Sequence, residues 1–267
     1  MGKWKETQEA YFGQTDSSEE NTGRVLPILF NTEMVQAILD GRKTVTRRLV
    51  KKSQCMLADK KEPRELDRKY ALFDGMTDAE LIASTYKQPY QRGDILYVRE
   101  TWRVGAWDIH KQMIAFDYKD GTCGELVHIH DRQLFERLVD QSREDARKAR
   151  CEYNGVDFVW EKGKSPCRWH PSIHMSKEAA RIWLKVTDVW VERLQDIDDE
   201  GAKAEGANWK NGKHVGFEEK LQRSAVERFA EIWNGTIKSA DQILYGWDAN
   251  SFVWVIEFKR CEKPEDL

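Results

Sequence analysis

Apolar and polar positions along the chain follow two different periods, which predict strands and helices in an irregular order. Alternating or continuous apolar residues predict strands over 25–30, 95–100, 113–118, 180–194 and 252–258. The first and last elements are strands, and isolated helices separate the strands without regular alternation. We therefore expect an α+β fold built on a small antiparallel or mixed β-barrel, with flanking helices and a helical insertion.

The strand predicted over 180–194 contains a change of phase. Leu184 and Val186 occupy one face, whereas Val189 and Val191 follow with the opposite parity. One extra residue in a paired strand produces such a shift, so we expect a β-bulge around Thr187–Asp188.

Apolar residues at helical spacing predict helices over 78–86, 131–151 and 198–205. A further amphipathic helix is expected to begin at the capping box of Ser224 and to end at Gly235.

A short helix predicted over Thr32–Asp40 precedes the most unusual segment of the chain, Gly41–Arg48. We expect Thr32 to cap this helix and Gly41 to end it in a left-handed turn. Four cations and two hydroxyls follow within the segment: Arg42, Lys43, Thr44, Thr46, Arg47 and Arg48. A buried helix would thus present a rigid basic turn suited to holding a phosphate or polarising a carbonyl.

The distribution of polar stretches predicts one domain with two insertions. Residues 1–23 are expected to form a disordered tail, residues 24–260 a single domain, and residues 261–267 a short tail. Within the domain, residues 49–92 and 106–167 are expected as insertions.

Composition narrows the function classes. The net charge of −3 with 33% charged residues gives no global basic field, so binding of nucleic acid requires a local patch. Most of the eleven tryptophans are expected in the core, with a few as stacking surfaces. The five cysteines are scattered without a C-x-x-C pair, which favours a reducing compartment, and the N-terminus lacks an apolar run. We expect a cytoplasmic protein without a membrane segment.

Five motifs together resemble a known family. They are Ile38–Arg47, Gly93–Val98, Arg99–Trp102, Trp169–Met175 and Phe252–Phe258. In this order the motifs resemble the ASCH domain of the PUA-like superfamily over residues 24–105 and 168–260, with greatest likeness to uncharacterised phage and prophage proteins.

The resemblance implies a small barrel that handles RNA or modified nucleosides, in the host cytoplasm if the protein is phage-encoded. One branch of the family removes the acetyl group from N4-acetylcytidine, and its catalytic residues correspond here to Lys43, Thr46 and Glu205. Another member of the superfamily is a ribonuclease. The resemblance implies no cofactor.

The chemistry of these three residues depends on local geometry. Threonine needs a neighbouring base to act as a nucleophile, and Lys43 serves either as that base or as a cation beside an oxyanion. Glu205 can exchange protons with the leaving amine. In a straight strand Lys43 and Thr46 would point to opposite faces, so we expect a turn after Gly41 that brings them together. The alternative is that all three are structural or solvated.

Two further sets of residues are candidates for binding. Arginine forks and indoles suit phosphates and bases, and a groove is predicted from Arg42, Arg47, Arg48, Arg99, Trp102, Arg103 and His170, with Trp107 beside them. Cys167, His170 and His174 have ligand-like spacing that His128, His130, Cys123 or Cys151 would have to complete, but no second pair lies at regular spacing, so we predict no metal.

Three functions therefore remain open. The first is hydrolysis of a modified nucleoside or RNA, and the second is binding of RNA or a nucleotide without catalysis. The third is a phage accessory role in which the inserted helix 131–151 binds a host protein.

Overall fold

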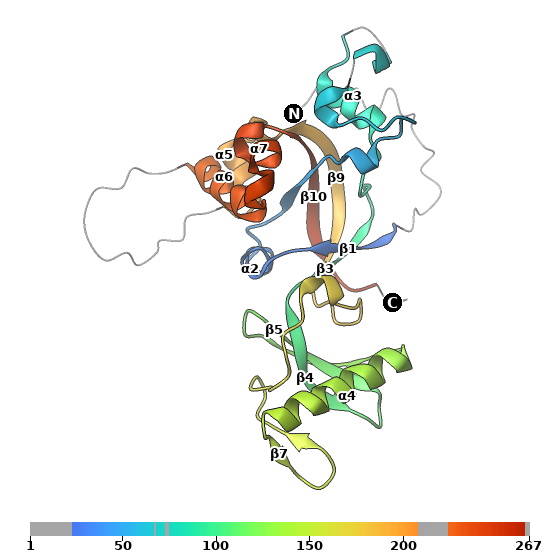
Figure 1. Ribbon diagram of the computed structural model, residues 1–267, viewed down its shortest axis with the longest axis vertical. Coiled ribbons are helices and arrows are strands. Elements are labelled where there is room, and N and C mark those ends of the chain that lie inside the picture. The colour runs from blue at the N-terminus through green and yellow to red at the C-terminus, as the bar shows by residue number, and fades with distance from the viewer. Residues whose placement is uncertain (1–22, 67, 73–74, 208–223, 265–267) are drawn as a thin grey trace, which may run out of the picture.

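The computed structural model describes residues 23–66, 68–72, 75–207 and 224–264, and it has an α+β fold (Figure 1). The main part contains a five-stranded sheet in the order β1-β3-β9-β10-β2. Its strands are β1 (Val25–Leu29), β2 (Val45–Leu49), β3 (Ile95–Arg99), β9 (Trp183–Arg193) and β10 (Phe252–Cys261). β1 runs parallel to β3, and the other pairs are antiparallel. β10 thus includes the first residue of the expected C-terminal tail, whereas residues 1–22 and 265–267 lie outside the described residues.

The predicted bulge in the longest strand is confirmed. Glu257 and Phe258 of β10 pair with Asp188 and Val186, which leaves Thr187 as the extra residue of β9. Because the bulge reverses the parity, the apolar side chains on both sides of it face one core. They are Leu184, Val186, Val189 and Val191.

The first helix, α2 (Thr32–Leu39), is capped one residue earlier than expected. The side chain of Asn31 accepts a hydrogen bond from the Met34 amide, so Asn31 is the N-cap and Thr32 is the first helical residue. The correction has a simple cause, since asparagine is at least as good an N-cap as threonine. Gly41 adopts φ +73, as the prediction of a left-handed turn requires.

Helices α5 (Asp199–Ala204), α6 (Ala225–Thr236) and α7 (Gln242–Tyr245) lie together on one side of the sheet (Figure 1). The capping box at Ser224 is confirmed, but α6 continues through Gly235 and reaches Thr236. A single glycine costs a helix only about 1 kcal/mol, and the buried side chains of α6 outweigh that cost.

Residues of the first expected insertion contribute to the main core. Helix α3 (Asp78–Thr85) buries Ile82 against the sheet, and Cys55 and Tyr86 belong to the same apolar cluster. This segment is therefore packed into the domain.

The second expected insertion, 106–167, belongs to a separate lobe that begins earlier, at Trp102, and lies at the bottom of Figure 1. Its elements are β4 (Trp102–Asp108), β5 (Met113–Tyr118), β6 (Cys123–His128), α4 (Arg132–Lys148), β7 (Glu152–Tyr153) and β8 (Phe158–Val159). The apolar face of α4 packs into a cluster of its own with the three-stranded sheet β4-β5-β6. The lobe therefore has its own core.

The chain enters the lobe and leaves it at neighbouring positions. Trp102 and His170 exchange two backbone hydrogen bonds of 3.2 and 2.7 Å. Beside them the guanidinium of Arg181 donates to both carboxylate oxygens of the buried Glu100, each at 2.8 Å. Among the described residues, no helix is both long and apolar enough to cross a membrane.

Candidate functional site

A pocket of about 720 Å³ opens beside β2 in the main part of the molecule. Strand β1, the end of β3 and helix α6 form its other walls. Its charged lining residues are Lys43, Arg47, Arg48, Lys51, Arg99 and Glu205, and its aromatic ones are Phe30, Tyr90, Phe229 and Trp233. The pocket thus combines an apolar wall with an excess of cations.

Two chain segments that are distant in sequence meet at the floor of this pocket. Lys43 and Glu205 form an isolated antiparallel bridge, and the Thr44 amide donates to the Ala204 carbonyl at 2.8 Å. Gly206 follows with φ +87, where a Cβ would lie 3.0 Å from that of Ala37. The two glycine turns, at the ends of α2 and α5, therefore place Lys43 against Glu205.

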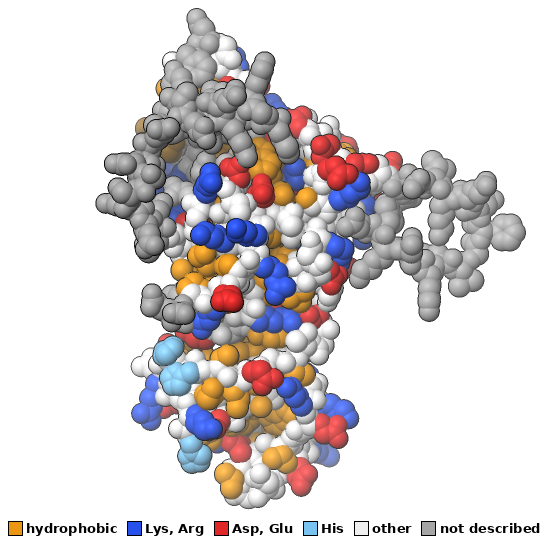
Figure 2. Space-filling model, turned by 180° about the vertical axis from the view of Figure 1, so that it is seen from behind, with side chains coloured by type: hydrophobic (Ala, Val, Ile, Leu, Met, Phe, Trp, Pro, Cys, Tyr) orange, Lys and Arg blue, Asp and Glu red, His pale blue; other side chains and the backbone are white. Residues whose placement is uncertain are grey.

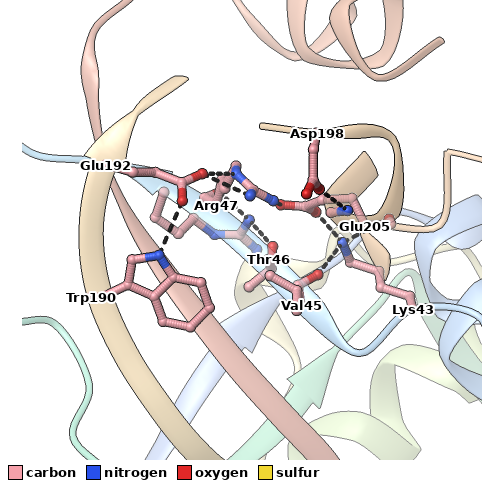
Figure 3. Close-up of polar contacts among 10 residues, drawn as sticks. Lys43, Val45, Thr46, Arg47, Trp190, Glu192, Asp198 and Glu205 are labelled. Carbon is pink, nitrogen blue, oxygen red and sulfur yellow. Dashed lines mark hydrogen bonds and ion pairs between the residues drawn. The ribbon is translucent and has the colours of Figure 1, made fainter. Parts of the chain in front are cut away.

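The Lys43 ammonium is buried and fully hydrogen-bonded. Its Nζ donates to Glu205 Oε2 at 2.5 Å, to the Glu205 carbonyl at 2.9 Å and to the Val45 carbonyl at 2.8 Å (Figure 3). Burial lowers the pKa of Lys43, while the negative charge of Glu205 acts in the opposite direction. Three acceptors match the three protons of an ammonium, so the contacts favour the charged form.

The Glu205 carboxylate belongs to a short chain of charges. Its Oε1 accepts a hydrogen bond from Arg47 Nη1 at 3.3 Å, and the same guanidinium donates to Glu192 Oε1 through Nε at 2.8 Å. Trp190 donates its indole hydrogen to Glu192 at 3.0 Å (Figure 3). Two carboxylates and two cations thus balance each other, and the side chains of Lys43, Arg47 and Glu205 are 1%, 4% and 6% exposed.

Thr46 lies in β2, so the expected turn does not extend to it. The strand begins at Val45, and Lys43 reaches the same pocket because it precedes the strand and folds back onto the Val45 carbonyl. The buried Thr46 Oγ1 accepts a hydrogen bond from Arg48 Nη1 at 2.6 Å. Among the described residues no hydrogen bond joins it to Lys43 or Glu205. The three residues thus share one pocket, and an arginine holds the hydroxyl.

The residues predicted to form one groove occupy separate places. Arg47, Arg48 and Arg99 line the pocket. Arg42 lies outside it and forms an ion pair with Asp40, with 2.8 Å between Nη2 and Oδ2. Trp102 is buried in the core of the lobe, where its ring stacks on His170 with centroids 4.5 Å apart. Their separation follows from the chain's departure into the lobe at Trp102.

Two further aromatic or basic candidates also lie in the lobe. Arg103 is held by Asp117 and by the carbonyls of Gly163 and Ser165. Trp107 donates its indole hydrogen to Asp157 at 2.9 Å. Basic and acidic side chains are mixed over the face shown in Figure 2, whereas five of the six charged residues that line the pocket are cations.

Among the described residues, the candidate histidines and cysteines do not come together as a metal-binding group. Cys167 is buried in the lobe core and His174 is exposed at the surface. His128 and His130 contact each other, with ring centroids 4.7 Å apart. In the described part of the chain, no group of three or more histidine, cysteine or acidic side chains is placed to hold a metal ion.

Three residues of the site were not predicted from the sequence. Glu192 holds Arg47 but does not itself line the pocket, and the one signal for it was a charged residue within an apolar strand. The aromatic residues Tyr90 and Trp233 gave no signal at all, because burial in a core predicts the same residue types.

Comparison of the chain with protein-family models, with curated proteins and with solved structures finds no match.

Proposed function

We propose that this chain is a PUA-like protein of the ASCH type that handles RNA or modified nucleosides in the Lys43 pocket. The proposed reaction is hydrolysis of an N-acyl amide on a nucleobase. The motif resemblance supports the family, and the α+β fold is compatible with it, although β1 and β2 remain the unpaired edges of the described sheet. Arg48 on the edge strand β2 donates to the Leu29 carbonyl of the other edge strand, β1, at 3.0 Å. This contact draws the two edges of the sheet toward each other, as a small barrel requires.

The observation that carries the proposal is the buried carboxylate of Glu205, held by two buried cations beside the buried hydroxyl of Thr46. Removing charges from water is costly, and perturbed, buried ionisable groups in a cleft are typical of functional sites. Aromatic side chains that line the same pocket offer surfaces on which a base could stack.

The proposed mechanism assigns one role to each of the three residues. The Thr46 hydroxyl attacks the acyl carbon, and its proton passes to the Glu205 carboxylate. The Lys43 ammonium stabilises the oxyanion by a hydrogen bond. This bond takes the place of one of the two bonds that Lys43 now donates to the Val45 and Glu205 carbonyls. The tetrahedral intermediate then collapses and releases the nucleobase amine, which takes the proton from Glu205. Water finally hydrolyses the acyl-threonine, which regenerates Thr46 and releases the carboxylic acid.

The second candidate function is binding of RNA or a nucleotide without catalysis. The resting contacts favour it, because all three ammonium protons of Lys43 are engaged and the Thr46 hydroxyl is bonded to an arginine. A host protein bound by the inserted helix is a weaker candidate. The apolar face of α4 is buried in the lobe, so such a partner would meet its charged face.

The two functions are separated by incubating the protein with N4-acetylcytidine and, in parallel, with single-stranded RNA. Release of cytidine and acetate that is lost in Thr46→Val supports the hydrolase, and Lys203→Met serves as the control because Lys203 is a half-exposed residue of α5. Cleaved RNA would indicate a ribonuclease. Retention of intact RNA that is lost in Arg48→Met, without any turnover, would support binding alone. Absence of turnover, cleavage and retention would refute the proposed function.

A further inference from the structure

The positive charges of the pocket are not all balanced. Lys43 and Arg47 have carboxylate partners within 3.3 Å. Within the described part of the chain, no carboxylate forms an ion pair with Arg48, Arg99 or Lys51, although all three line the same pocket. The pocket therefore has room and charge for an anionic group that the described residues do not supply.

Arg48 and Arg99 lie on either side of one residue of β1. Arg48 Nη2 donates to the Leu29 carbonyl at 3.0 Å, and Leu29 is the register partner of Arg99 on β3. Neighbouring strands are about 4.8 Å apart, so Arg99 begins one strand beyond the carbonyl that holds Arg48. Both arginines line the pocket, and this part of its wall is called the Arg48–Arg99 edge.

Both guanidinium groups retain unused donors. The contacts of Arg48 use Nη1 and Nη2 and leave Nε without a partner among the described residues. Arg99 donates through Nη2 to the Ile173 carbonyl, while its Nε is buried and makes no hydrogen bond. A buried donor without a partner is costly, so the hydrogen bonding of Arg99 is incomplete among the described residues.

The same edge is connected to the proposed reacting group. Arg48 bonds both Thr46 and the Leu29 carbonyl, so one side chain spans the distance between the hydroxyl and the neighbourhood of Arg99. Burial lowers the pKa of Arg48, while the negative charge of Glu205 acts in the opposite direction, and a neighbouring anion would add to the effect of Glu205.

We propose that the Arg48–Arg99 edge binds the phosphoryl group of a nucleotide, so that the ligand of the pocket is a nucleotide and not an uncharged nucleoside. This inference rests on the proposed function. A phosphoryl group has several acceptor oxygens, which suit two arginine forks better than a single carboxylate does. The phosphoryl group belongs either to a free mononucleotide or to an RNA backbone.

The test compares ligands that differ only in the phosphoryl group. Binding of cytidine, cytidine 5′-monophosphate and inorganic phosphate to the full chain is measured by calorimetry. We expect the affinity for the monophosphate to be at least roughly tenfold higher than that for cytidine. High salt should reduce this difference in affinity. Arg99→Met should remove this difference between the two ligands, and Arg99→Lys should restore part of it. Arg42→Met is the matched control, because Arg42 is paired with Asp40 outside the pocket.

The outcomes separate this inference from the proposed function. Equal binding of cytidine and its monophosphate, unaffected by Arg99→Met, would overturn the phosphoryl site and leave the nucleoside pocket intact. Binding of inorganic phosphate as tightly as the monophosphate would reduce the edge to a general anion site and overturn the inference. No binding of any of these ligands would overturn both. A short oligocytidylate without terminal phosphates identifies the source, since tighter binding than the monophosphate indicates an RNA backbone and weaker binding a free nucleotide.

Discussion

Replacing Lys43 by methionine tests whether its ammonium stabilises the fold as the contacts imply. The substitution keeps the apolar stem and removes three hydrogen bonds, to the carbonyls of Val45 and Glu205 and to the Glu205 carboxylate. The charged cluster of Lys43, Arg47, Glu192 and Glu205 changes from neutral to −1 in a buried site. Removing one partner of a buried pair costs about 3–5 kcal/mol. We expect the free energy of unfolding to fall by that amount.

Urea denaturation followed by far-UV circular dichroism measures this change. Lys203→Met is the control, because Lys203 pairs with Glu200 on the surface of α5 and its side chain is 49% exposed. Such pairs contribute about 0–1 kcal/mol. In the double variant Lys43→Met/Glu205→Gln the cluster is neutral again, so it should be more stable than Lys43→Met alone. A Lys43→Met protein within about 1 kcal/mol of the wild type would refute the reasoning.

Three other regions yield predictions of the same kind. Gly206→Ala places a side chain at φ +87 and 3.0 Å from Ala37 Cβ, and we expect a loss of about 1–2 kcal/mol in urea unfolding, whereas equal stability would contradict the packing described. Burial holds the pKa of His170 below its ordinary value of 6.5, so the unfolded chain binds more protons than the folded one. The free energy of unfolding should therefore fall as the pH drops below 6.5. His170→Phe should lack the contribution of this histidine to the fall, as measured by denaturation series at two pH values. Deleting Thr187 removes the bulge and turns half of β9 over, so the deletion should abolish the cooperative unfolding transition. Thr187→Val should retain this transition, because it loses only a buried hydroxyl that has no partner among the described residues.

Local signals in the sequence were sufficient for much of the main sheet. The phase change at Thr187 and the capping box at Ser224 involve residues close together in the chain, and both predictions were correct. In the lobe the signal was weak. β6 is a six-residue strand with mostly half-buried or exposed side chains, so its apolar pattern does not stand out from a loop.

Long-range contacts of the site could not be derived from periodicity. Lys43 and Glu205 are 162 residues apart, and only the family resemblance paired them. The grouping of Trp102 with Arg99 rested on side-chain chemistry and on the family resemblance. It failed because the chain changes from the main sheet to the lobe between these two residues.

The single junction at Trp102 and His170 has a consequence for how this chain can vary. Since the two crossings are hydrogen-bonded neighbours, the lobe resembles an oversized connection between adjacent points, and lengthening or shortening it adds little loop-closure entropy. Relatives of this chain with a compact turn in place of the whole lobe would therefore be structurally reasonable, with the walls around Lys43 left intact.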